Sequence, residues 1–414
     1  MTMKPKDELT ITMKRRIPFA AAIVGKRASI SNAAIAETVG ILMPTHDIER
    51  KFLTYGVFMK ITRLAAAATL LANLGSVHAA DDPATAFYKW WGVVDVNVGH
   101  MTNQDQGTAG EGSVLSIGQG GMYGSRIGVN GKSAPVDGVR AIFNLEGGVA
   151  LHDASTLAFN RYALVGLESK AGMIRGGTML KPYDDTAWNY EPMESMGFSL
   201  GSLTSWRGFG STTKTVRLDS AAVGGFKASA FYSFGGVADN TTAKSRYGVL
   251  GTASIGLVDV LAYYESGANA DGKRTETTQS WNGSTGTMTA LQAKAKVGTA
   301  ATVYLGYNGF GAPDAAAGKP TKSNVVFAGV GYQATDKLNL KLGAYKFEQS
   351  DIKDQGATQL ALGAQYNIGV ATVYGVVGHL ENQANGKLSL DGAPDGAQAG
   401  AAQNGVKVGI VYVF

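Results

Sequence analysis

Side chains alternate between apolar and polar with a period of two residues along most of this 414-residue chain. Every second residue from Val406 to the terminal Phe414 is apolar, and similar alternation recurs in 136–149, 224–235 and 287–298. Because successive side chains of a β-strand point to opposite faces, this period predicts strands that separate two different environments. No run of 18 apolar residues occurs after residue 80, so the sequence predicts no membrane-spanning helix there.

The connections between these segments are of two kinds. Some are tight turns rich in glycine, asparagine or aspartate, at 136–138, 222–225, 333–337 and 367–369. Others are long and polar, at 101–118, 180–210, 236–245, 267–286, 312–322 and 383–401. Tight turns that alternate with long loops, joined by amphipathic strands of about ten residues, are typical of transmembrane β-barrels.

Sixteen segments carry the strand pattern. They span 87–100, 119–132, 136–149, 158–168, 171–179, 212–221, 224–235, 245–256, 257–266, 287–298, 299–310, 323–334, 336–348, 356–368, 369–381 and 402–414. In a bilayer every backbone N–H and C=O group needs a partner, and a closed barrel has no free edge. The sequence therefore predicts an all-β fold, a transmembrane antiparallel β-barrel of 16 strands.

A soluble β-sandwich would show the same alternation. It would not need six long loops alternating with tight turns, nor aromatic residues near the strand ends, where Tyr88, Trp90, Tyr307 and Tyr412 lie. Tyrosine and tryptophan form girdles at the two interfaces of membrane barrels. The aromatic pattern therefore favours the barrel.

Residues 59–79 have the three parts of a secretory signal peptide. A basic start that contains Lys60 precedes a short apolar run, and small or tolerated residues up to Ala79 form a cleavage site. The apolar run is shorter than the ~20 residues of a transmembrane helix. We interpret 1–58 as an upstream extension assigned by a wrong start codon, and expect the barrel over 80–414.

The formal charge of +5 comes from the segment that would be removed. Residues 1–79 hold 11 of the 37 Lys and Arg residues and 5 of the 32 Asp and Glu residues. The other 335 residues hold 26 basic and 27 acidic side chains. This near-neutral balance gives no support for nucleic-acid binding, and it leaves open whether a channel would prefer anions or cations.

The composition disfavours an enzyme. The chain has no cysteine and 5 scattered histidines, so we expect no disulfide, no metal and no cofactor. Gly197–Gly201 fits the Gly-x-Ser-x-Gly motif of serine hydrolases, which needs a following helix and a downstream acid and histidine. Only His379 lies downstream, and no helical pattern follows the motif. A barrel hydrolase would also need a Ser–His pair at the lipid boundary, which we do not find.

Four segments and the last residue resemble the trimeric general porins of β-proteobacteria. The family's opening strand, its Gly-Ser-Arg-x-Gly second strand, and its third and fourth strands are matched by 91–96, 123–131, 138–148 and 160–167, and the terminal aromatic by Phe414. The order and spacing of these pieces together make the resemblance specific, and it covers nearly the whole chain after residue 80.

The resemblance implies a sixteen-stranded homotrimer whose third loop folds into the lumen, opposite a wall of arginines. The loop is 180–210, and its acidic residues are Asp184, Asp185, Glu191 and Glu194. The arginines at matching positions are Arg126, Arg140 and Arg161, with Arg175 as a fourth. The family often has arginine where this sequence has Thr178, so the charge of the constriction can differ here.

Residue parity independently places arginines in the lumen. Arg126 shares a face with Asn130, and Arg140 shares one with Glu146, whereas the parity of Arg161 is unclear. Opposed rings of acidic and basic side chains would create a transverse field that favours small hydrophilic solutes and ions over apolar molecules. The alternative is that the acidic residues are ordinary solvated loop charges.

The function that follows is an outer-membrane channel for passive diffusion. The last strand, with Ile410, Tyr412 and Phe414, resembles the signal read by the barrel-assembly machinery, although a plain lipid-facing stripe would look the same. Such a barrel would sit in the Gram-negative outer membrane, in contact with lipid and lipopolysaccharide. A barrel with a mainly adhesive or structural role is one alternative. A substrate-selective porin is another, hinted at by Tyr123, Tyr183, Trp188 and Tyr190.

Overall fold

The computed structural model describes residues 86–105, 110–151, 158–275, 285–393 and 396–414. The expected upstream extension 1–58 and signal peptide 59–79 lie outside these residues. Among the residues described, no helix is both long and apolar enough to cross a membrane.

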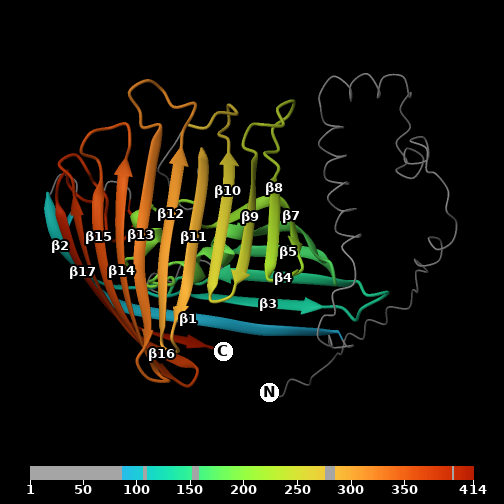
Figure 1. Cartoon of the computed structure of the whole chain (residues 1–414). Coiled ribbons are helices and arrows are strands. Elements are labelled where there is room, and N and C mark those ends of the chain that lie inside the picture. The colour runs from blue at the N-terminus through green and yellow to red at the C-terminus, as the bar shows by residue number, and fades with distance from the viewer. Residues whose placement is uncertain (1–85, 106–109, 152–157, 276–284, 394–395) are drawn as a thin grey trace, which may run out of the picture. The chain divides into compact units, whose positions relative to one another are not determined.

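Antiparallel strands make up most of this part of the chain (Figure 1). In chain order they are β1 (Phe87–Asp105), β2 (Glu111–Gly118), β3 (Arg126–Lys132), β4 (Arg140–Gly148), β5 (Ala158–Ser169), β6 (Gly172–Leu180), β7 (Ser211–Ser220), β8 (Phe226–Ser233), β9 (Arg246–Ile255), β10 (Val258–Gly267), β11 (Thr287–Val297), β12 (Ala301–Gly311), β13 (Lys322–Gln333), β14 (Leu338–Gln349), β15 (Ala357–Ile368), β16 (Ala371–Asn382) and β17 (Ala402–Val413). The first strand pairs with the last, from Val93 opposite Val413 to Met101 opposite Gly405, so the sheet closes on itself.

Two of these strands together form one strand of the barrel wall. β3 pairs with the first part of β1, from Phe87 to Val93, and β2 pairs with the later part, from Asn97 to Asp105. The wall therefore has sixteen strands, which confirms the predicted fold class. The long loop expected at 101–118 is wrong, because β1 continues to Asp105 and β2 adds a strand there.

The carboxylate of Asp95 fills the interruption between β2 and β3. It accepts hydrogen bonds from the amide N–H groups of Met122 and Tyr123 at 2.8 and 2.6 Å, and from the Tyr374 hydroxyl at 2.6 Å. The hydroxyl oxygen of Ser125 accepts a hydrogen bond from the Asp95 amide N–H at 2.9 Å. Backbone groups that lose their hydrogen-bond partners at a break between paired strands must find other partners. Here the buried carboxylate of Asp95 accepts the hydrogen bonds of the Met122 and Tyr123 amides.

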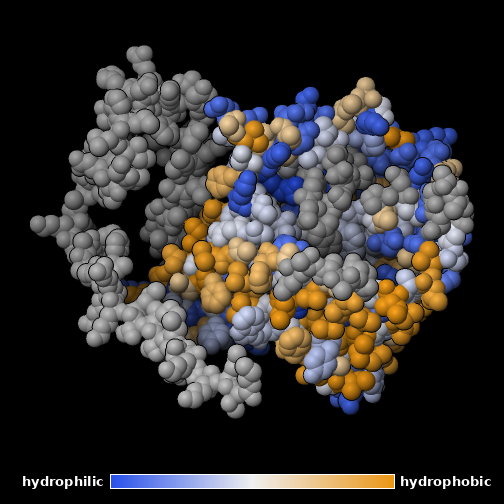
Figure 2. All heavy atoms as spheres, turned by 180° about the vertical axis from the view of Figure 1, so that it is seen from behind, coloured by the Kyte–Doolittle hydropathy of each residue, from blue (hydrophilic) through white to orange (hydrophobic). Residues whose placement is uncertain are grey.

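Apolar side chains cover the outside of the wall. Leu291, Leu305 and Val165 are 63%, 65% and 68% exposed. Figure 2 shows hydrophobic residues gathered in a broad area over the strands, with hydrophilic residues toward one end. An outward apolar band of this kind suits lipid, while inward positions of the same strands are polar or packed.

The segment between β6 and β7, residues 181–210, lies inside the barrel, and we call it the inner loop. It contains two short helices, α4 (Pro182–Ala187) and α5 (Leu200–Leu203), and one 3-10 turn, η2 (Trp188–Tyr190). Most of its side chains are buried. This is the loop that the family resemblance implied would fold into the lumen.

Candidate functional site: the inner loop and the facing wall

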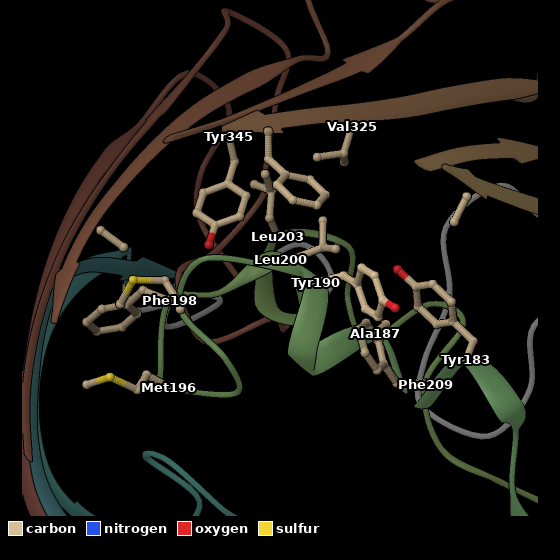
Figure 3. Close-up of a cluster of buried hydrophobic side chains, with 14 of the residues drawn as sticks. Tyr183, Ala187, Tyr190, Met196, Phe198, Leu200, Leu203, Phe209, Val325 and Tyr345 are labelled. Atoms are coloured by element: carbon tan, nitrogen blue, oxygen red, sulfur yellow. The ribbon is translucent and has the colours of Figure 1, made fainter. Parts of the chain in front are cut away.

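Apolar contacts attach one side of the inner loop to the barrel wall. Figure 3 shows Leu200 and Leu203 near Tyr345 of β14, with Phe198 to their left and Val325 of β13 to their right. All five belong to one buried cluster. Burying apolar side chains of this size contributes roughly 1.5–3 kcal/mol each. The cluster therefore fixes the loop against β13–β16.

Glycines on the wall make room for this attachment. A β-carbon at Gly378 or Gly405 would lie 2.6 or 2.5 Å from ring atoms of Phe198, which is closer than van der Waals contact allows. Without side chains, the two strands β16 and β17 accept the phenylalanine ring directly against their backbone. Part of the glycine content of this chain thus serves the docking of the loop.

Hydrogen bonds fix the loop along its length. The Tyr183 hydroxyl accepts from the side-chain amides of Gln292 and Asn308 at 2.8 and 2.7 Å. Further along, the Gln359 amide donates to the Phe198 carbonyl at 2.7 Å. Because these groups are buried, leaving any of them without a partner costs about 1–3 kcal/mol. The loop is therefore held by polar as well as apolar contacts.

The loop backbone adopts conformations that need such support. Glu194, Ser195, Phe198, Ser205 and Trp206 have φ between +46° and +70°. The left-handed region costs roughly 1–2 kcal/mol for a residue with a side chain. Strained residues persist only where the surrounding structure determines them, and they gather at functional sites.

A cavity of about 1170 Å³ remains on the other side of the loop. Its charged lining residues are Arg126, Glu146, Arg161, Asp184, Asp185, Glu194, Lys244 and Arg246. Its aromatic lining residues are Trp91, Tyr123, Phe159, Tyr162, Trp188 and Trp206. The cavity thus lies between the inner loop and the wall formed by β1 and β3–β9.

Two of the predicted arginines meet on the wall of this cavity. The Nε atoms of Arg161 and Arg126 lie 2.5 and 3.4 Å from the same oxygen of Glu146, so one carboxylate serves two cations. The pairing of β4 with β5 shifts register between Glu146 and Gly148. Such a bulge re-aims nearby side chains, which explains how Arg161 reaches the lumen when parity did not place it there.

The other two predicted arginines are not brought to the cavity lining. Arg175 pairs with Asp219 of β7 at 2.6 Å. The neighbouring Arg217 of β7 pairs with Asp185 of the loop. Arg140 lies at the opposite end of β4 from Glu146. Six strand residues correspond to about 20 Å. Thr178, where the family often has arginine, does line the cavity.

The acidic residues of the loop have different surroundings. Asp184 accepts hydrogen bonds from the indole N–H of Trp188 at 2.9 Å and from the Gly210 amide at 2.7 Å. Asp185 forms an ion pair with Arg217 and accepts a hydrogen bond from the Tyr162 hydroxyl. Glu194 pairs with Lys341 and accepts the Tyr304 hydroxyl at 2.8 Å. Burial raises the pKa of Asp184, although Arg161 counteracts the shift.

Glu191 does not line the cavity, because it faces the wall instead. It is fully buried and accepts hydrogen bonds from the Tyr345 hydroxyl at 2.8 Å and from the Ser195 amide at 3.1 Å. Burial raises the pKa of Glu191 to about 7, and these hydrogen bonds counteract the shift in part. Glu191 therefore anchors the inner loop to β14.

Sequence reasoning missed the buried polar residues that support the loop. Asp95 and the pair of Lys181 with Glu265, 3.3 Å apart, are fully or nearly fully buried, as is Lys341, the partner of Glu194. For Asp95 and Lys341, the only signal was a position on the inward face of a strand between apolar sequence neighbours. Glu265 has an apolar sequence neighbour on one side only. Lys181 follows the end of β6 and had no such signal. A charged residue on a face that is otherwise packed predicts a buried partner, but not which one.

The terminal strand places its predicted residues on the outside. Ile410, Tyr412 and Phe414 are 49%, 48% and 58% exposed. The backbone of Phe414 exchanges two hydrogen bonds with Gly92, at 2.8 and 3.0 Å. The last residue therefore takes part in closing the barrel.

Two further predictions concern enzymes and metals. Ser199 of the Gly-x-Ser-x-Gly motif is fully buried before α5, while His379 is exposed on β16 and bonds to Asn404. Within the described parts of the chain, no three His, Cys, Asp or Glu side chains gather as metal ligands would.

Comparisons with known proteins agree with this architecture. Residues 65–385 match the family model described as Gram-negative porin. The chain is 28% identical over 358 residues to outer membrane porin protein 32 of Delftia acidovorans, covering 78% of this chain and 93% of the relative. It is 31% identical over 114 residues to major outer membrane protein P.IB of Neisseria gonorrhoeae, covering 27% of this chain and 32% of the relative.

Solved structures show the same fold. The anion-selective porin from Comamonas acidovorans aligns with a TM-score of 0.67 and 23% identity, over 80% of this chain and all of that one. The trimer form of OmpT from Vibrio cholerae aligns with a TM-score of 0.56 and 18% identity, over 80% of this chain and all of that one. Because the family model spans most of the chain and the barrel closes with sixteen strands, this chain belongs to the Gram-negative porin family and is an outer-membrane channel for passive diffusion of small hydrophilic solutes and ions.

Proposed function

We propose that the constriction of this channel lies between the inner loop and the wall that carries Arg126 and Arg161, and that it prefers anions. The observation that carries the proposal is the cavity itself, which has the loop carboxylates on one side and two arginines on a shared glutamate on the other. Asp185 and Glu194 are each paired with a cation, which reduces their effect on the pore.

The charges around the cavity favour this sign. The lining residues and their direct ion-pair partners comprise five carboxylates, at Glu146, Asp184, Asp185, Glu194 and Glu265. They also comprise six cations, at Arg126, Arg161, Arg217, Lys244, Arg246 and Lys341. An excess of one positive charge in a narrow pore raises the local concentration of anions. The solved porin from Comamonas acidovorans is described as anion-selective, which agrees with this sign.

Removing the two arginines tests the proposal. In planar bilayers with a KCl gradient, the double variant Arg126→Ala/Arg161→Ala should lower the anion-to-cation permeability ratio about three-fold or more, because Glu146 is left without its cations. The matched control is Arg140→Gln, which removes an arginine that does not line the cavity. An unchanged reversal potential in the double variant would refute the constriction assignment.

Docking of the inner loop should depend on pH through Glu191. Burial raises its pKa to about 7, so the neutral form is favoured in the docked loop. The contribution of this group to docking is complete below its ordinary pKa of 4.5 and is lost as the pH rises through the raised pKa of about 7. Open-channel current noise should therefore be larger at pH 8 than at pH 6. Glu191→Gln should remove the difference, and equal noise in the unmodified channel at both values would contradict the prediction.

We infer that the chain is a homotrimer without enzymatic activity. The solved OmpT structure is described as a trimer form, and the named relatives are porins rather than enzymes. Val165 and Leu167 give β5 an apolar outer face, which suits a contact between subunits as well as lipid. The mass of the purified protein in detergent, before and after boiling, tests the trimer: a monomer mass in both would exclude it.

Export follows from the same assignment. We propose that residues 59–79 are removed as a signal peptide and that residues 1–58 are not part of the protein. The exposed Ile410, Tyr412 and Phe414 are then available to the barrel-assembly machinery, and the apolar outer face to lipid and lipopolysaccharide. The intact mass of the outer-membrane form checks the first point, since a mass that includes residues before 80 would overturn it.

A further inference from the structure

The cavity combines arginines with a group of aromatic side chains. Trp188 and Trp206 of the inner loop, and Trp91 and Tyr123 near the start of the barrel, line it and are only partly buried. A water-filled pore for ions gains nothing from such surface, because exposed apolar area costs about 25 cal/mol per Å². Aromatic faces exposed beside cations instead suit a solute that has both a ring and a negative charge.

The aromatic rings of the inner loop are held in place. Trp188 stacks on Phe209 with ring centroids 4.3 Å apart, and its indole N–H donates to Asp184 at 2.9 Å. The ring centroids of Trp206 and Trp188 are 6.0 Å apart. The Trp206 ring packs directly on the backbone of Gly201, where a β-carbon would lie only 2.6 Å from the ring. Stacking, a hydrogen bond and close backbone approach together make the two indoles a fixed surface, so little ordering is needed when a ring binds.

Neighbouring side chains also hold the arginines in place. The Arg126 guanidinium lies 5.8 Å from the centre of the Tyr123 ring and 6.0 Å from that of Trp91. Arg126 and Arg161 share Glu146, so one of their two positive charges is not balanced within this trio. A carboxylate can accept parallel hydrogen bonds from guanidinium groups, which makes it a matched partner.

From these contacts we propose that the cavity is a binding site for small aromatic carboxylates, of the size and shape of benzoate. The ring lies against Trp188 and Trp206, and the carboxylate meets Arg126 and Arg161. This proposal rests on the constriction proposed above and adds a solute class to it. An aliphatic acid would use only the arginines, and a neutral ring only the indoles.

Blockade of ion current is the direct test. Benzoate added to one side of a planar bilayer in KCl should reduce the open-channel current in a saturable way, whereas acetate and benzamide at the same concentration should not. Trp206→Ala and the double variant Arg126→Ala/Arg161→Ala should each raise the half-blocking concentration of benzoate about ten-fold. Trp188→Phe, which keeps a ring on Phe209, should change it less than about three-fold.

A matched tryptophan on the outer face serves as the control. Trp90 is 62% exposed next to the lumenal Trp91, and Trp90→Ala should leave blockade unchanged. Equal blockade by acetate or by benzamide, or no blockade by benzoate, would overturn the proposed site. If benzoate fails to block while Arg126→Ala/Arg161→Ala still lowers anion selectivity, the aromatic site is refuted and the constriction stands. If selectivity does not change either, both proposals fail.

Discussion

Deleting residues 188–206 of the inner loop and joining the ends with a short glycine–serine link should raise the single-channel conductance about two-fold or more. The loop is attached inside the barrel by the cluster around Phe198 and Tyr345, so its removal widens the lumen at the level where the loop lies. The barrel itself should survive, because each wall strand pairs with its neighbours and not with the loop.

The matched control is a deletion in another connection. Residues 313–319 between β12 and β13 are mostly exposed, and removing them should leave the conductance unchanged. An unaltered conductance after deletion of 188–206 would show that the inner loop does not set the resistance of the pore. Planar-bilayer recordings of both variants, refolded in detergent, give the answer.

Replacing Asp95 by alanine should destabilise the barrel by about 3–5 kcal/mol. The change leaves the Met122 and Tyr123 amides and the Tyr374 hydroxyl without their acceptor in a buried place. Asp95→Asn keeps one acceptor oxygen and should cost less. Unfolding by urea, followed through tryptophan fluorescence in detergent or lipid vesicles, measures the difference.

A second aspartate provides the comparison for this effect. Asp259 of β10 lies 3.8 Å from Lys294 with its side chain 33% exposed, so Asp259→Ala should cost less than about 1 kcal/mol. Equal losses at Asp95 and Asp259 would mean that the break between β2 and β3 does not depend on the buried carboxylate.

The sequence predicted the wall well because one physical rule governs it. In a barrel of this size each strand separates lipid from lumen, so side chains alternate between apolar and polar along the strand. This alternation made strands such as β11 and β14 predictable without knowledge of the tertiary structure. The rule failed at 101–118, where β2 shows only Leu115 and Ile117 as apolar outward residues among glycine and serine. Pairing with β1, rather than a hydrophobic pattern, decides that strand.

The site was harder to predict because parity gives the face of a strand but not the height along it. Arg140 and Glu146 share a face of β4, yet only Glu146 reaches the cavity. Nor does a cluster of acidic residues show which member faces water: Glu191 is buried against Tyr345, while Glu194 lines the pore. The arginine that contacts the loop, Arg217, had a lumenal parity but no motif to mark it.

The anchors of the inner loop also determine when it can form. Tyr183 bonds to Asn308, Glu191 to Tyr345 and Phe198 to Gln359, across 125, 154 and 161 residues of chain. The Gly197 amide donates to the Gly121 carbonyl at 2.7 Å, in the break that follows β2. Contacts between residues so far apart in sequence form late in folding.

Loop docking therefore has to wait until strands from both ends of the chain have met. A freshly inserted barrel should conduct at a high level and then settle to a lower one as the loop docks, which recordings made during insertion would reveal. On the constriction proposed above, the narrowest part of this channel is the last to be built, and a cell that inserts the barrel would have a wide pore in its outer membrane until that step is complete.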